Sequence, residues 1–439
     1  MIRIILIRHG STAWNTGERS QDRFRGIVDL PLAADGLQQA EATAQRLVNV
    51  PLAAVYTSPL QRARRTAEII AAPHKLAVQP LPGLSSMDYG DWAGLLYSEV
   101  AHRWPDLYRK WRRNPFSVTI PGGESTASLK ERAVAALHHA LSLHRDNSTL
   151  ALVSHQAVIK ALICALAGLP DVAYWRVRQD LCNLSLLDYE PESGMFDLSG
   201  LNDICHLGLS LPRTTGDGVR IILLRHGQTA WNQGAGEERF RGRTDLPLDG
   251  TGIAQANTLT DRLRHEPIDA IYASPLQRTR QTVAPLASAL DLTPEPEQGL
   301  LDIDYGQFQG LSRSEAAAAY PELYKLWLSR PSQVRFPNGE SLDDVQTRLK
   351  SMLDRIAEAH PNQTVVLAGH QMVNKVLACT LLGIDLDQVW RLRQDTASIN
   401  YYQRMRDDWR VLCLNETCHL FEPGNAPSLR PVDGYGPTV

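Results

Sequence analysis

Two short segments place a histidine between an arginine and a glycine directly after an apolar run. Residues 4–15 read IILIRHGSTAWN and residues 221–232 read IILLRHGQTAWN, which gives the candidate groups Arg8-His9 and Arg225-His226. A neutral imidazole can attack phosphorus without a metal ion. A guanidinium offers planar, paired donors that match phosphate oxygens. These residue types predict phosphoryl chemistry at both segments.

Other polar residues extend each segment into a candidate anion site. Asn15 and Asn232 follow seven residues after their arginines and can donate amide hydrogens to the same anion. The motif SPLQR places Arg62 and Arg278 in the first turn of a predicted helix, where free N–H groups and the helix dipole attract anions. The sequence therefore predicts a phosphate site in each half of the chain.

A second histidine follows a later apolar strand in each half. These histidines are His155 and His370, and each precedes a glutamine and an apolar helix. Two histidines beside two arginines could suggest a metal site, but the arginines would repel a metal ion and no cysteine or carboxylate completes a ligand set. We expect no metal and no cofactor, with one histidine as the nucleophile and the other as a donor to the phosphoryl oxygens.

The order of these landmarks repeats along the chain. His226 follows His9 by 217 residues, Arg278 follows Arg62 by 216, and His370 follows His155 by 215. The chain is therefore predicted to be a tandem duplication, with domains at 1–210 and 219–421 joined through the Pro- and Gly-containing segment 212–218. Residues 422–439 are rich in Pro and Gly and are predicted to form a surface or disordered tail.

The elements that must position these groups alternate between strands and helices. In the first half, strands are expected at 2–7, 53–56 and 149–153, and helices at 36–48 and 156–167. A helix is also expected from the SPLQR motif onward, with Ser58 as its N-cap and Pro59 as its first residue. This alternation predicts an α/β fold of two tandem three-layer α/β/α domains, each with a mostly parallel central sheet.

Bulk composition limits the possible partners. The formal net charge is −3 and 43% of residues are hydrophobic, so no basic field attracts nucleic acid or anionic lipid. No stretch is long and apolar enough to span a membrane. We expect a cytoplasmic enzyme that binds a small-molecule phosphoester; the sequence does not indicate its oligomeric state.

Taken together, the motifs resemble those of the histidine phosphatase superfamily, the phosphoglycerate mutase-like clan in its first branch. The resemblance rests on RHG-x-T, SPLxR-x-x-T, a YG element, GES and a late strand followed by histidine, and it covers nearly all of both halves. The tandem arrangement and the segment IDYGQFQGL are similar to those of plant 2-carboxyarabinitol-1-phosphate phosphatases. The resemblance implies that His226 and His9 accept the phosphoryl group. It implies phosphate pockets of Arg225, Asn232, Arg278 and His370 in the second half and Arg8, Asn15, Arg62 and His155 in the first.

The two halves differ at the position of the proton donor. The family usually has Glu three residues before the Tyr of the YG element; here Asp302 fills that position in the second half and Ser86 in the first. An alcohol is a poor proton donor at neutral pH. Asp88 lies nearby but has Asp304 as its counterpart, which favours a structural role in the turn. We therefore expect the second half to be catalytic, with Asp302 as the acid, and the first half to be impaired.

Substrate-reading residues are less defined by the sequence. After the FRG motif the first half has Ile27 and the second half has Arg243. In the family this loop lines the substrate pocket. Arg243 therefore either binds a carboxylate or second phosphate of the substrate or is a solvent-exposed arginine. Gln371, directly after His370, is a second candidate for substrate recognition.

Three functions remain open at this point. Mutases of the clan carry a longer insertion before GES, whereas residues 311–339 are compact here, which favours a phosphomonoester hydrolase over a phosphoglycerate mutase. A phosphate-binding regulatory or scaffold protein is the alternative from another class, which Ser86 supports for the first half only. Sugar phosphates or bisphosphates, phosphoglycerates, phosphoserine and α-ribazole phosphate are the candidate substrates.

Overall fold

The computed structural model describes residues 1–15, 23–208, 210–214, 216–232, 239–405 and 408–421. The chain divides into two compact units at Ser210, and each unit contains one copy of the repeated motifs. The expected tail at 422–439 lies outside the described residues. Among the residues that are described, no helix has the length and apolarity needed to cross a membrane.

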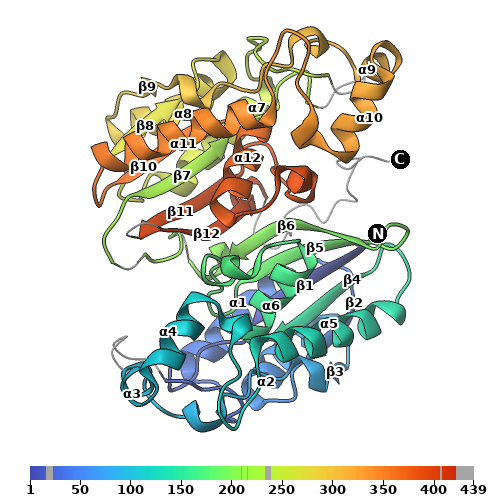
Figure 1. Cartoon of the computed structure of the whole chain (residues 1–439), viewed down its shortest axis with the longest axis vertical. Coiled ribbons are helices and arrows are strands. Elements are labelled where there is room, and N and C mark those ends of the chain that lie inside the picture. The colour runs from blue at the N-terminus through green and yellow to red at the C-terminus, as the bar shows by residue number, and fades with distance from the viewer. Residues whose placement is uncertain (16–22, 209, 215, 233–238, 406–407, 422–439) are drawn as a thin grey trace. The chain divides into compact units, whose positions relative to one another are not determined.

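A mixed sheet forms the centre of the first domain. Its strands lie in the order β3-β2-β4-β1-β5-β6. Strands β1 to β4 are parallel to one another, β5 runs antiparallel to β1, and β6 runs antiparallel to β5. The strands are β1 (Ile2–Arg8), β2 (Leu52–Thr57), β3 (Val78–Pro80), β4 (Thr149–Ser154), β5 (Leu184–Glu190) and β6 (Met195–Asp203). The β-branched run of β1 is buried because it lies inside the sheet with helices on both faces (Figure 1).

Helices cover the two faces of this sheet in pairs. One pair is α1 (Ala34–Leu47) and α2 (Gln61–Ala71), which pack on Ile5 and Ile7 of β1. The other pair is α5 (Thr126–Ser142) and α6 (Gln156–Leu166). Between β3 and α5, the chain forms the short helices α3 (Tyr97–Arg103) and α4 (Pro105–Arg113). The domain is therefore a three-layer α/β/α structure, as the alternating pattern predicted.

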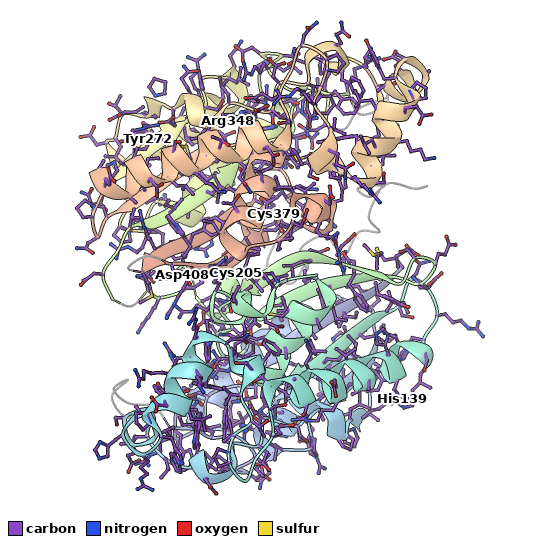
Figure 2. The ribbon with its side chains drawn as sticks, in the orientation of Figure 1. His139, Cys205, Tyr272, Arg348, Cys379 and Asp408 are labelled. Atoms are coloured by element: carbon purple, nitrogen blue, oxygen red, sulfur yellow. The ribbon has the colours of Figure 1, made fainter. Side chains whose placement is uncertain are left out.

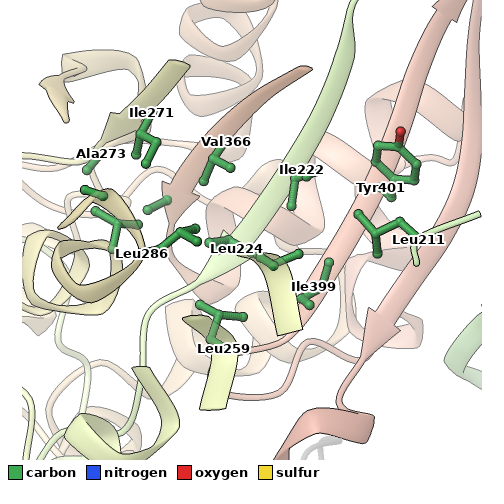
Figure 3. Packing of buried hydrophobic residues seen from close by; sticks show 14 of the residues in the cluster. Leu211, Ile222, Leu224, Leu259, Ile271, Ala273, Leu286, Val366, Ile399 and Tyr401 are labelled. Atoms are coloured by element: carbon green, nitrogen blue, oxygen red, sulfur yellow. The ribbon is translucent and has the colours of Figure 1, made fainter. Parts of the chain in front are cut away.

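The second domain repeats this architecture. Its strands lie in the order β9-β8-β10-β7-β11-β12, namely β7 (Arg220–Arg225), β8 (Ala270–Ala273), β9 (Glu295–Pro296), β10 (Thr364–Gly369), β11 (Ile399–Met405) and β12 (Asp408–Glu416). Its helices are α7 (Gly250–Leu263), α8 (Gln277–Leu290), α9 (Arg313–Ala319), α10 (Pro321–Ser329), α11 (Leu342–Ala359) and α12 (Gln371–Leu382). Figure 3 shows Leu259 and Leu286 packed against the strand residues Ile222, Leu224 and Val366.

One sequence expectation about these elements is wrong. Helix α2 begins at Gln61, with Leu60 at the N-cap position, so neither Ser58 nor Pro59 starts it. The hydroxyl of Ser58 instead lies before the helix, where Oγ accepts from the backbone N–H of Leu60 at 3.3 Å and lies 2.8 Å from Nε2 of His155. Ser58 therefore combines a local turn contact with a tertiary contact to the histidine.

A close backbone approach fixes the loop that carries each first histidine. Gly252, in the first turn of α7, faces the loop residue Gln228 so closely that a Cβ on Gly252 would lie 2.1 Å from the carbonyl oxygen of Gln228. Gly36 makes the same approach to Ser11 in the first domain, also at 2.1 Å. Only glycine fits at these positions, so the helix start sets the path of the chain just after the histidine.

This contact predicts a large difference between two neighbouring glycines. Gly252→Ala is expected to lower the free energy of unfolding by about 1–3 kcal/mol, because the backbone must shift to admit the methyl group. Gly250→Ala in the same turn is the matched control, because a Cβ there meets nothing within 4 Å. Urea-induced unfolding of both variants measures the effect; equal midpoints would show that the loop does not depend on this contact.

Candidate active site

The two histidines of each domain lie at the ends of adjacent parallel strands. Arg225 pairs with Gly369 in the β7–β10 register, and the backbone N–H of His226 donates to the Gly369 carbonyl at 3.1 Å. His370 follows Gly369 directly, so the rings of His226 and His370 lie 5.3 Å apart between centroids. In the first domain the centroids of His9 and His155 are 5.2 Å apart. The sheet register thus brings together residues that are about 145 positions apart in each half.

The hydrogen bond to the ring of His226 defines its tautomer. Nδ1 lies 2.7 Å from the carbonyl oxygen of Gly227, and a carbonyl oxygen can only accept, so Nδ1 carries the proton. Nε2 then holds the lone pair, and among the described residues it has no hydrogen-bond partner. His9 is fixed in the same way by the Gly10 carbonyl at 2.7 Å. Both rings have the tautomer that a nucleophilic Nε2 requires.

Burial and nearby cations keep these rings neutral. Burial is the largest cause that holds the pKa of His226 well below its usual value, followed by the charges of Arg278 and Arg225. The pKa of His9 is lowered by burial first and then by Arg62 and Arg8. A neutral ring is required for nucleophilic attack, so the environment favours the reactive form.

Arg225 is buried with only part of its donor capacity used. Its Nη1 donates to the Gln394 carbonyl at 2.6 Å, whereas Nε and Nη2 are buried without a hydrogen-bond partner among the described residues. Asn232 shows the same pattern: Oδ1 accepts from the N–H and the hydroxyl of Thr229 at 3.0 and 2.9 Å, and the buried Nδ2 has no partner in the described part of the chain. Unpaired buried donors are costly, so this cluster is suited to an anion.

Arg278 is oriented by main-chain carbonyls. Nη1 donates to the carbonyl of Thr244 and Nη2 to that of Gly242, both at 2.7 Å. Burial is the largest cause that lowers the pKa of Arg278, to about 10, so the group keeps its charge at neutral pH. Its Nε donates to Nδ1 of His370 at 3.1 Å, and Nη2 also lies 3.4 Å from Oδ2 of Asp302.

The second histidine of each domain is held by a serine that sequence reasoning missed. Because Nδ1 of His370 accepts from Arg278, Nε2 must carry the proton, and it donates to Oγ of Ser274 at 2.9 Å. The hydroxyl of Ser58 lies 2.8 Å from Nε2 of His155 in the first domain. Both serines directly follow the strand that neighbours the histidine strand, β2 or β8. The serine of the SPLQR motif was the available signal in the sequence, although its position before a helix predicts an N-cap.

The position of the expected acid is equivalent in the two domains, although the side chains differ. Arg348, labelled in Figure 2, donates from α11 to the carbonyl of Asp302 at 3.4 Å, and Arg132 donates from α5 to the carbonyl of Ser86 at 2.9 Å. Asp302 is 6% exposed and Ser86 is 7% exposed. Only the second domain therefore has a buried carboxyl at this place.

Burial raises the pKa of Asp302 above its usual value, although Arg278 and Arg241 act in the opposite direction. Oδ2 of Asp302 lies 3.8 Å from Nδ1 of His370. A carboxyl with a raised pKa holds its proton to higher pH than an exposed one, which suits a general acid.

The Nε of the site arginine has a different acceptor in each domain, although equivalent loop carbonyls hold both guanidinium groups. In the second, Nε of Arg278 faces His370 and Nη2 faces Asp302; in the first, Nε of Arg62 donates instead to Nε2 of His9 at 3.2 Å. Nδ1 of His155 is then buried without a hydrogen-bond partner among the described residues. The arrangement in the first domain thus places an N–H against the lone pair that would attack phosphorus.

Three further residues named from the sequence lie outside the histidine–arginine cluster. Asp88 holds a turn, because its Oδ1 accepts from the N–H of Gly90 at 2.9 Å. Arg243 is exposed and forms ion pairs with Asp304 at 3.4 Å and Glu340 at 3.2 Å. Gln371 is half-buried at the start of α12.

Arg241 and its counterpart Arg25 are site residues that the sequence analysis did not select. Arg241 is buried and donates to the Trp231 carbonyl at 2.9 Å. Its charge lowers the pKa values of both His226 and His370, which places it beside the site. The arginine of the repeated FRG motif was the available signal in the sequence, where only the position after this motif, Arg243, was predicted to bind substrate.

The fold and this cluster define a class of phosphoryl-transfer protein, and comparison with known proteins gives the family. The model of the histidine phosphatase superfamily (branch 1) matches residues 4–203 and 221–417. The chain therefore belongs to this superfamily and contains two copies of its domain, which confirms the family and the phosphatase class that the motifs implied.

Several curated relatives carry more particular names. Phosphoserine phosphatase 1 of Hydrogenobacter thermophilus is 37% identical over 46% of this chain and 95% of its own length. The 2-carboxy-D-arabinitol-1-phosphatase of Triticum aestivum is 27% identical over 95% of this chain and 86% of its own length. A probable phosphoglycerate mutase, GpmB of Yersinia enterocolitica, is 33% identical over 48% of this chain and 96% of its own length. The wheat protein therefore matches the tandem arrangement as well as the domain.

The serine contact predicts a defined loss of activity. Ser274→Ala removes the acceptor for the buried Nε2–H of His370, which is worth about 1 kcal/mol or somewhat more, so kcat/KM for an alkyl phosphomonoester should fall roughly tenfold. Ser58→Ala makes the same change in the first domain and should leave this activity within about twofold. Steady-state kinetics of both variants tests the assignment, and equal losses would contradict it.

The pKa shifts predict the shape of the pH profile. Because His226 must be neutral, the acid limb of kcat/KM should lie below pH 6.5, the usual value of histidine. Because Asp302 must be protonated, activity toward an alkyl phosphate should decline as pH rises above its raised pKa. In Asp302→Asn, measured with the same substrate, this decline should be absent, and only the ionisation of the substrate should still change kcat/KM with pH. An unchanged basic limb would exclude Asp302 as the acid.

Proposed function

We propose that the chain is a metal-independent phosphomonoester hydrolase whose second domain works through a phosphohistidine on His226. The observation that carries this proposal is the buried cluster in which a neutral imidazole with an open Nε2 lies among Arg225, Arg278 and His370, with the carboxyl of Asp302 beside them. Phosphoryl transfer needs positioning and charge neutralisation above all, and the cluster supplies both.

In the first step the phosphate group would occupy the cluster. The unpaired donors of Arg225 and Asn232, together with Arg278, would donate hydrogen bonds to its oxygens. The lone pair of His226 Nε2 forms a bond to phosphorus while the bond to the leaving oxygen breaks, and Asp302 gives its proton to that oxygen. The Gly227 carbonyl holds the Nδ1 proton of the ring and so balances the positive charge that develops on it.

In the second step water would release the phosphoryl group. The carboxylate of Asp302, now without its proton, is positioned to accept a proton from the attacking water, and the bonding pair returns to Nε2 of His226. Inorganic phosphate leaves and the initial protonation states are restored. His370 donates its Nε2–H to Ser274 and accepts from Arg278, so it would hold Arg278 in place beside the phosphoryl oxygens in both steps.

For the substrate we propose a small phosphorylated hydroxy acid. Phosphoserine and 2-carboxyarabinitol 1-phosphate, the substrates that two relatives are named for, both combine a phosphate ester with a carboxylate. Buried Arg241 supplies a further cation beside the cluster, and Arg243 lies at the same loop. Phosphoglycerates share this chemistry. A cytoplasmic location is part of the proposal, in keeping with the composition.

A phosphoglycerate mutase is the second candidate, because the relative GpmB carries that name. The products separate the two activities. Incubation with 3-phosphoglycerate and a trace of bisphosphoglycerate should release inorganic phosphate if the chain is a hydrolase. Formation of 2-phosphoglycerate without free phosphate would make it a mutase.

Paired histidine variants test which domain carries the main activity. His226→Ala should reduce kcat toward phosphoserine and 3-phosphoglycerate by at least about 10³-fold, since it removes the nucleophile of the competent site. His9→Ala is the matched control and should keep most of the activity. Phosphate release by the two purified full-length variants is the measurement. If His9→Ala loses activity and His226→Ala keeps it, the roles of the domains are reversed.

A further inference from the structure

We propose that the first domain is a phosphoryl acceptor for activated donors, acyl phosphates in particular, and that it discriminates against ordinary alkyl phosphate esters. The inference rests on the proposed function, since it assumes the same histidine chemistry in both domains. It assigns to the first domain a substrate class that differs from that of the second.

The first domain retains the groups needed for attack on phosphorus. The Nδ1–H of His9 donates to the Gly10 carbonyl, and the residue is 4% exposed. Arg62 is oriented by the carbonyls of Val28 and Gly26 at 2.7 and 2.8 Å, as Arg278 is by its own loop. Oδ1 of Asn15 accepts from Thr12, which leaves the amide N–H groups for an anion.

Among its described residues, the first domain has no carboxyl in the position of Asp302, because Ser86 takes that place. The carboxylates around it are engaged in other contacts. Asp88 accepts from Gly90, Asp29 accepts from the backbone and side chain of Gln61 at 2.7 and 3.2 Å, and Glu124 pairs with Arg132 at 2.7 Å. The charges of Asp29 and Asp180 act on Arg62 and Arg8, but Asp180 pairs with Arg178 at 2.7 Å, and none of these described carboxylates fills the acid position.

The lack of an acid matters for some leaving groups and not for others. An alkoxide is about as basic as hydroxide, the conjugate base of water with its pKa of about 15.7, so it needs a proton as it leaves. The leaving group of an acyl phosphate is a carboxylate, which is stable without a proton at neutral pH. General acid catalysis is worth about 10²–10⁴-fold, and this factor is what the first domain loses with alkyl esters but not with acyl phosphates.

The proposed reaction is balanced without a further reactant. Nε2 of His9 forms a bond to phosphorus, the bond between phosphorus and the acyl oxygen breaks, and the carboxylate leaves with the electron pair. Arg62 Nε, which now donates to Nε2 of His9 at 3.2 Å, would turn its N–H to a phosphoryl oxygen. Water then attacks phosphorus, the bond between phosphorus and Nε2 breaks, and the proton of the attacking water passes to solvent. Since Ser86 cannot act as a base, this second step is slow and the phosphohistidine on His9 persists.

Leaving-group dependence in full-length variants tests the proposal. In the His226→Ala chain only the first domain can react, and kcat/KM should fall at least 100-fold from acetyl phosphate to glycerol 3-phosphate, beyond the ratio seen in the His9→Ala chain. An alkaline quench with mass spectrometry should find the phosphoryl group on His9. If His226→Ala impairs folding, His226→Gln and labelling of the wild-type chain by acetyl phosphate provide the same mapping.

A reciprocal exchange of the acid position provides matched controls. Ser86→Asp in the His226→Ala chain should raise kcat/KM for glycerol 3-phosphate by tenfold or more and change kcat/KM for acetyl phosphate little, since kcat/KM reports only the transfer to histidine. Asp302→Ser in the His9→Ala chain should lower kcat/KM for glycerol 3-phosphate by about 10²-fold or more while leaving kcat/KM for acetyl phosphate nearly unchanged. The two exchanges move the same functional group in opposite directions.

The outcomes separate this inference from the proposed function. If acetyl phosphate labels His226 but never His9, or if the His226→Ala chain treats both donors alike, the inference is wrong and the proposed function stands. If neither histidine is labelled by any donor, the proposed function fails and the inference fails with it. Labelling of His9 together with the steep dependence on the leaving group supports both.

Discussion

Positively charged guanidinium groups are buried beside uncharged imidazoles in both domains, and the rest of the site depends on this constraint. Burial of a cation without a partner is costly, so each arginine is held by main-chain carbonyls that partly offset its charge. Gln394 accepts from Arg225, and Gly242 and Thr244 accept from Arg278. Burial first and the remaining positive potential second lower the pKa of His226 and His370, and that potential is available to an anion.

The neutral histidines follow from that constraint in a direct way. A protonated imidazole beside Arg278 would add one more positive charge to a buried site that already holds three arginines, so the ring stays neutral and the Gly227 carbonyl selects the tautomer. The arrival of a phosphate dianion reverses the electrostatic balance, since the arginines then have a partner. The same groups that would suppress protonation of the free site would thus stabilise the charge of a phosphoryl group in transit.

The duplicated domains show what one side chain does to such a site. With Asp302 present, Arg278 divides its donors among His370, the carboxyl and the loop carbonyls. With Ser86 in that place, the Nε of Arg62 donates to His9. The two scaffolds are otherwise closely matched, from the register of the central strands to the serine that holds the second histidine. Besides the exchange of the acid itself, the two sites therefore differ in the acceptor of one arginine Nε.

The duplication, the α/β class and the family could be predicted from the sequence, because hydrophobic periodicity and the repeated RHG and SPLQR motifs are local signals. The same signals identified both histidines of each half and the difference between Asp302 and Ser86. The contacts of Ser274 and Arg241, the ion pairs of Arg243 and the acceptor of Arg62 Nε became visible only in the folded chain. Those contacts depend on which strand ends become neighbours and on which donors remain unpaired after burial, and neither can be inferred from residues that are far apart in the sequence. Ser58 is the clearest case: its local context indicates a helix cap, but its hydroxyl also binds a histidine 97 residues away.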